Sequence, residues 1–193
     1  MLRDQWWDPK VLLEAAHAIR RATPDYEFFC DPTYQPVRQA INAATFATRR
    51  PWNRDWEVRP VPLHEEFPDA QLRYGNDVRW VEIAEADREN RRRSAEYQAE
   101  RDKPPRWIHY DPGEEAELAL DEIKRVLGQK AAKHYRPKPH ILIYVNLSGG
   151  EPTALYADGL AQLYGDCFES AWLLWQENTF RLWPNPAKIR ISQ

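Results

Sequence analysis

The chain has 193 residues, of which 42% are hydrophobic and 30% charged, and its net charge is −3 at pH 7. This length and balance fit one domain with an apolar core and a well-solvated surface. The slight negative net charge does not by itself support nucleic-acid binding. Binding stays possible if the basic residues gather on one face of the protein. No apolar run approaches the roughly 20 residues of a membrane helix, and no N-terminal segment resembles a signal peptide. We therefore expect a cytoplasmic protein with no membrane association, in which Cys30 and Cys167 are reduced thiols.

Two helices are predicted in residues 1–50. Asp8 and Pro9 combine an N-cap residue with a proline at the first helical position, and an apolar stripe continues to Ile19. Residues 37–48 place small apolar side chains on one helical face. Residues 56–63 are expected to be an extended segment at a sheet edge, because Pro60 and Pro62 cannot donate to a neighbouring strand.

Residues 67–86, FPDAQLRYGNDVRWVEIAEA, predict a β-hairpin with Gly75-Asn76 as its two-residue turn. In that register Asp69 lies opposite Glu82 on the same face, with Cβ atoms about 4.5–5.5 Å apart. Two carboxylates at that separation repel each other, and a divalent cation such as Mg²⁺ or Mn²⁺ would offset the repulsion. Two alternatives stay open: water screening at an open sheet end, or a longer loop that shifts the register by one residue.

The rest of the chain predicts a helix, a buried strand and further short elements. Residues 114–135 have a strong helical period, and residues 140–148 form a nearly continuous apolar run typical of a strand with neighbours on both sides. A short helix over 153–164 and a closing hairpin around Glu177-Asn178 follow. Together these elements predict an α/β fold, with helices flanking a mixed β-sheet in a single domain.

The pair Pro68-Asp69 followed by Glu82-Ile83-Ala84 resembles the motif of the PD-(D/E)xK nuclease superfamily. That signature places an Asp at the start of one core strand and Glu-x-Lys on the next, followed by a helix and a further strand. The order of predicted elements from about Trp56 to Trp183 is similar, so the resemblance implies a restriction-endonuclease-like core over 56–183 behind the N-terminal helices.

The resemblance implies that Asp69 and Glu82 bind Mg²⁺ or Mn²⁺, with the backbone carbonyl of Ile83 as a third ligand. One departure is clear: Ala84 stands where the family has the lysine that orients or deprotonates the attacking water. A helical wheel of residues 114–135 puts Lys130 inside the apolar face, together with His134. A lysine there needs a carboxylate partner, and some members of the superfamily supply their lysine from a neighbouring helix. Alternatively, Lys130 extends to water near the helix C-terminus.

Further candidates lie on either side of the motif. Glu85 faces away from Glu82 in a regular strand and joins the site only if the strand ends or bulges there. Residues 87–106 are polar on every side and are expected to be the most mobile internal segment. The basic residues in it could grip the phosphates of DNA or RNA, or could simply form a solvated face paired with nearby glutamates; the first of them are Arg88, Arg91, Arg92 and Arg93.

Three functional hypotheses follow. The first is a metal-dependent nuclease in which Lys130 acts with Asp69, Glu82 and Glu85. The second is a catalytically inactive domain of the same fold that binds nucleic acid or protein, which Ala84 favours. The third is a structural or interaction protein that uses its many aromatic side chains. Fold analogy alone does not decide between them.

Overall fold

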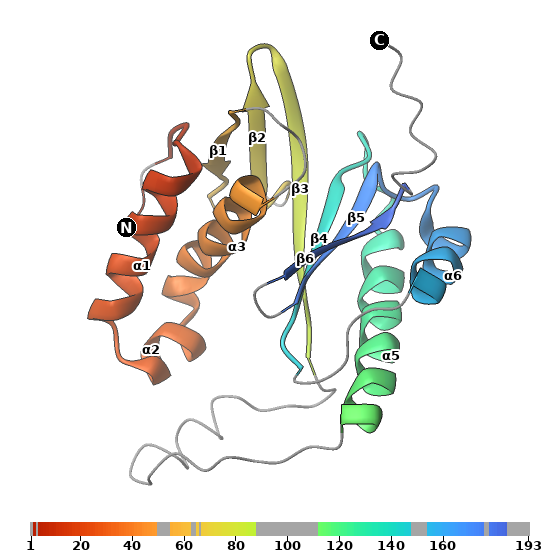
Figure 1. Ribbon diagram of the computed structural model, residues 1–193. Helices are drawn as coiled ribbons and strands as arrows, with labels where there is room; N and C mark the ends of the chain where they lie inside the picture. The colour runs from red at the N-terminus through yellow and green to blue at the C-terminus, as the bar shows by residue number, and fades with distance from the viewer. Residues whose placement is uncertain are drawn as a thin grey trace, which may run out of the picture. The chain divides into compact units, whose positions relative to one another are not determined.

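The computed structural model describes residues 2, 4–49, 55–62, 65, 67–87, 112–147, 154–175 and 178–184. These residues belong to two compact units, and the described part of the first ends at Val78 while that of the second begins at Arg79. Figure 1 shows the helices and strands that each unit contains.

The first unit begins with helices (Figure 1). Their bounds are Pro9–Ala22 for α1, Asp25–Cys30 for α2, Pro32–Tyr34 for the 3₁₀ helix η1 and Gln35–Arg49 for α3. The prediction for the start of α1 is confirmed, since the Asp8 carboxylate accepts hydrogen bonds from the backbone N–H groups of Lys10 at 2.8 Å and Val11 at 3.2 Å. The helix predicted over 37–48 corresponds to α3, whereas α2 and η1 were not expected.

Strand β1 (Glu57–Pro60) pairs antiparallel with β2 (Ala70–Tyr74) in this unit, and α3 packs against both. A turn at Gly75-Asn76 leads from β2 into β3 (Asp77–Ala86). Gly75 has a φ of +58°, the conformation that a type II′ turn requires at its first central position. The two strands and the turn predicted over 67–86 are therefore confirmed.

Strand β3 continues into the second unit and starts its mixed sheet. It pairs parallel with β4 (His140–Val145), which pairs parallel with β5 (Ser170–Trp175); β6 (Asn178–Trp183) is antiparallel to β5. Among the described residues the strands number six, in the order β1-β2-β3-β4-β5-β6. The expected α/β fold with a mixed sheet is confirmed, as is the buried strand with neighbours on both sides.

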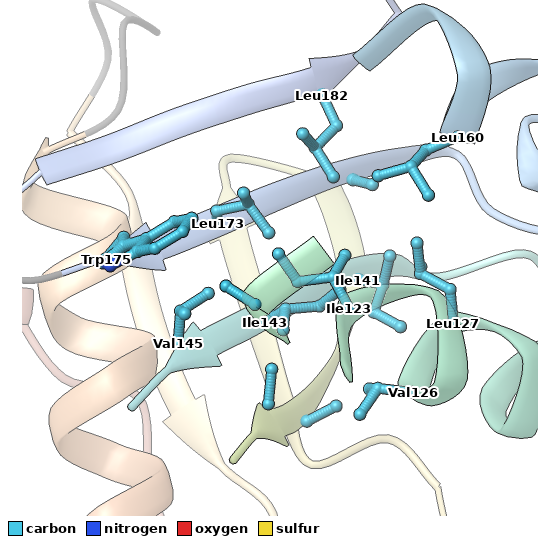
Figure 2. Close-up of a cluster of buried hydrophobic side chains, with 14 of the residues drawn as sticks. Ile123, Val126, Leu127, Ile141, Ile143, Val145, Leu160, Leu173, Trp175 and Leu182 are labelled. Atoms are coloured by element: carbon cyan, nitrogen blue, oxygen red, sulfur yellow. The ribbon is translucent and has the colours of Figure 1, made fainter. Parts of the chain in front are cut away.

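Helices α5 (Pro112–Ala131) and α6 (Ala154–Tyr164) cover one face of this sheet. The inward-facing side chains of the strands alternate along the chain, as in Ala84 and Ala86 on β3 or Ile141 and Ile143 on β4. Figure 2 shows Ile141 and Ile143 beside Ile123 of α5, and Leu160 of α6 belongs to the same cluster. This face, called the helix-covered face below, positions the candidate site.

Neither cysteine is in a disulfide: both Cys30 and Cys167 are free thiols, as expected. Among the described helices, none is both long enough and apolar enough to cross a lipid bilayer.

Candidate functional site

Glu82 lies on the helix-covered face of β3, within the core of the second unit. It is 2% exposed, its strand neighbours Val81 and Ile83 point to the opposite face, and its partner on β4 is Ile141. A buried carboxylate is costly unless charged or polar groups compensate it. The residues around its two oxygens therefore explain how the strand tolerates a glutamate.

Lys130 supplies the compensating charge from the last turn of α5. Its ammonium donates to Glu82 Oε1 at 2.5 Å and to the backbone carbonyl of Ile83 at 3.3 Å, while its side chain stays 20% exposed. The prediction that this amine lies within hydrogen-bond reach of a motif carboxylate is confirmed. The alternative, a lysine extended to water away from the carboxylates, is wrong.

Tyr135 completes the surroundings of Glu82, and the sequence analysis did not identify it. Its hydroxyl donates to the same Oε1 atom at 2.8 Å, and its ring lies 6.4 Å from that of Phe168. Helix α5 ends at Ala131, not at Tyr135 as expected, and His134 then adopts a φ of +50°. The helix therefore stops four residues early, which takes His134 off the helical face and leaves it exposed.

The second oxygen of Glu82 has a different environment. Oε2 is buried and has no hydrogen-bond partner among the described residues. A buried acceptor in that state costs about 1–3 kcal/mol, and more when it is charged. Oε2 is therefore the one position on this carboxylate where a cation or a water molecule could bind without displacing a protein donor.

The donor set available to a metal within the second unit is small. Carboxylate and carbonyl oxygens suit Mg²⁺, which commonly takes one or two carboxylates and completes its shell with water and substrate oxygens. Glu82 and the Ile83 carbonyl fit that pattern, but the Lys130 ammonium already contacts both. In the part of the chain that the structure describes, no three His, Cys, Asp or Glu side chains gather to hold a metal ion.

Asp69, the other carboxylate of the motif, belongs to the first unit and immediately precedes β2. Its Oδ1 accepts a hydrogen bond from the Gln39 side-chain amide of α3 at 2.6 Å, and its backbone carbonyl accepts one from Val61 at 3.1 Å. These bonds fix its position relative to α3 and to the residue that follows β1. The pairing of Asp69 with Glu82 concerns both units and stays a prediction.

The remaining candidates fall into two groups. Strand β3 pairs with β4 without a register shift, so Glu85 lies on the face opposite Glu82 and is exposed. The structure thus does not bring Glu85 to Glu82, because the bulge that this would need is absent from β3. The possible nucleic-acid contacts Arg88, Arg91, Arg92 and Arg93 lie outside the described residues, as does the segment expected to be mobile.

Comparison with known proteins identifies no relative of this chain. No family model matches it, and neither a curated protein nor a solved structure does so.

Proposed function

We propose that this protein is a metal-dependent nuclease that hydrolyses phosphodiester bonds of DNA or RNA, with a restriction-endonuclease-like fold. The observation that carries the proposal is the Lys130–Glu82 contact of 2.5 Å. Helix α5 supplies a lysine beside the motif glutamate. This lysine would replace the one that the superfamily has at the position of Ala84. The order β2, β3, α5, β4 is also the order in which the superfamily arranges its motif.

The roles of the residues follow from their contacts. Glu82 and the carbonyl of Ile83 would hold Mg²⁺ or Mn²⁺. Such an ion polarises the scissile phosphodiester and makes a bound water more acidic. Tyr135 keeps Oε1 of Glu82 oriented through its hydrogen bond, which leaves Oε2 for the ion.

Lys130 would act directly on the reacting groups. Water attacks the phosphorus, the bond to the leaving oxygen breaks, and that oxygen takes up a proton. An ammonium beside the carboxylate can hydrogen-bond the attacking water or a non-bridging phosphate oxygen, where negative charge develops. Its 20% exposure leaves room for such a contact from the solvent side.

A second candidate function is a non-catalytic domain that binds nucleic acid or protein, and one observation favours it. Lys130 contacts both Glu82 Oε1 and the Ile83 carbonyl, so the buried charge is neutralised without a metal. In that case the ammonium is the permanent cation of the site.

Calorimetry with Mn²⁺ and a plasmid-nicking assay distinguish the two. We expect the wild-type protein to bind Mn²⁺ and nick DNA, Glu82→Gln to lose both properties, and Lys130→Met to bind Mn²⁺ without nicking. Lys124→Met is the matched control, since Lys124 lies on the same helix with a side chain 45% exposed and should behave as wild type. Binding of Mn²⁺ by Lys130→Met but not by the wild type would favour the non-catalytic function. Absence of Mn²⁺ binding in both would refute the metal site.

A further inference from the structure

The second unit carries another unassigned cation, Arg181 of β6. By the strand register Arg181 lies opposite Trp172 and Thr179 opposite Leu174, so all four side chains share one face. A register shift after Arg181 brings Leu182 and Trp183 into the core on the helix-covered face. Arg181 and Thr179 therefore lie on the opposite face of the sheet from α5 and α6.

Arg181 is partly buried, and no acidic residue in the described part of the chain pairs with it. Its guanidinium stacks over the Trp172 ring, 5.1 Å from the centroid. Among the described residues it forms no ion pair, and its Nε is buried without a hydrogen-bond acceptor. Burial lowers the pKa of Arg181, and no carboxylate of the described ranges offsets that effect. The charge is thus partly desolvated and uncompensated.

The ring beneath Arg181 is held in a fixed orientation. Trp172 donates its indole N–H to the Ser170 hydroxyl at 2.7 Å, and that hydroxyl shares a 2.6 Å hydrogen bond with Nδ1 of His140. All three residues are at least 96% buried, with exposures of 1%, 2% and 4% for Trp172, Ser170 and His140. Because the indole cannot rotate without breaking this chain of bonds, the ring beneath the guanidinium keeps one orientation.

Thr179 adds a second unsatisfied group on the same face. Its hydroxyl is buried and has no hydrogen-bond partner among the described residues. Two residues apart on one strand, Thr179 and Arg181 present neighbouring side chains. Buried donors without acceptors destabilise a fold, so two of them side by side indicate a missing acceptor.

We propose that Arg181 and Thr179 form a binding site for a phosphate group. A guanidinium offers two parallel N–H donors to an oxyanion, and its Nε is the unused donor here. The Thr179 hydroxyl provides a third donor, which suits a tetrahedral oxyanion better than a planar carboxylate. The phosphate comes either as a free ion or as part of a nucleic-acid backbone. The inference does not depend on metal binding or on cleavage near Glu82.

Nitrogen-15 NMR of the full chain tests this site through two reporters, the Arg181 Nε–H and the Trp172 indole N–H. At constant ionic strength, inorganic phosphate should shift both signals saturably, whereas acetate should not. Arg181→Gln and Arg181→Lys should each weaken phosphate binding at least about tenfold, because each removes the guanidinium fork. For these variants the Trp172 signal is the reporter. Thr179→Val should weaken binding by a smaller factor.

Arg125→Gln is the matched control. Arg125 belongs to the same unit but is ion-paired with Glu122 at 2.6 Å, so phosphate binding should not change. A short DNA duplex distinguishes the sources: shifts with DNA and phosphate identify a backbone phosphate, and shifts with phosphate alone identify a free ion. Both results support the proposal.

Other outcomes would overturn the phosphate site. These are no saturable shift with either probe, equal shifts with acetate, or an equal loss in Arg125→Gln and Arg181→Gln. If circular dichroism shows that Arg181→Gln does not fold, Arg181→Lys and Thr179→Val decide by the same criteria.

Discussion

A double-mutant cycle on Lys130 and Glu82 tests whether the contact is a buried ion pair on which the fold of the second unit depends. Lys130→Met removes the ammonium and keeps an unbranched apolar side chain. The Glu82 carboxylate, with 3% side-chain exposure, then retains one hydrogen bond, from Tyr135. Removing one partner of a buried pair costs about 3–5 kcal/mol. Because the Lys130 side chain is 20% exposed and water can partly replace it, we expect a loss near the lower end, about 3 kcal/mol.

Glu82→Gln should also destabilise the protein, since it leaves the ammonium half-buried beside a neutral amide. The double variant Lys130→Met with Glu82→Gln removes both charges, so its loss should be smaller than the sum of the single losses. We expect a coupling free energy of about 2 kcal/mol, within the range for residues in direct contact.

The free energies of unfolding come from urea titrations followed by circular dichroism. Lys124→Met serves again as control and should change stability by no more than about 0.5 kcal/mol, as exposed substitutions do. A coupling free energy below about 0.5 kcal/mol would mean that water screens the pair as it does at a surface. The argument that Lys130 compensates a buried charge would then fail.

Three further stability predictions concern the fold of the two units, each measured by urea unfolding. Ile143→Ala should cost about 2–5 kcal/mol, because this side chain is fully buried in the core; a loss below about 1 kcal/mol would contradict its packing. Gly75→Ala should cost about 1 kcal/mol because of its φ of +58°, and Gly75→Asn should cost less; equal stability of all three would exclude a positive φ. Asp8→Ala should cost about 1 kcal/mol through loss of the N-cap, and Asp8→Ser should recover most of it; failure of that recovery would argue against capping.

The sequence predicted the elements that have a clear hydrophobic period or a defined turn chemistry. It did not predict features that depend on the backbone conformation of a few residues. The hairpin was predictable because Gly75-Asn76 has a defined turn chemistry, and Lys130 because a charge interrupts an apolar stripe. Helix α2 was missed because six residues are too few to show a helical period. On a continued helical wheel Tyr135 falls about 120° from Ile123 at about 100° per residue, away from the apolar face. That reasoning assumed that the helix continues, whereas the left-handed turn at His134 redirects the chain.

The phosphate site was not predictable for a related reason. Residues 178–183 have the pattern of a closing hairpin strand, and the alternation of side chains is the usual guide to their faces. The register shift beside Ala171 changes that alternation, because Leu182 and Trp183 both join one core. The shift changes only the face of Trp183, since Phe180 and Leu182 still alternate with Thr179 and Arg181. What the sequence does not reveal is that Arg181 has no carboxylate partner among the described residues.

Lys130 and Arg181 differ in what they can bind. Lys130 already has the Glu82 carboxylate as partner, so a metal ion must use Oε2 or displace the ammonium, whereas Arg181 has no carboxylate partner among the described residues that an anion would have to displace. The register places Glu82 and Arg181 on opposite faces of the sheet, which separates the two sites by a layer of backbone. Lys130→Met should therefore leave the phosphate titration of the Arg181 Nε–H unchanged, while Arg181→Gln should leave Mn²⁺ calorimetry unchanged. If either variant alters both titrations in a folded protein, phosphate and metal share one site and the separation argued from the register is wrong.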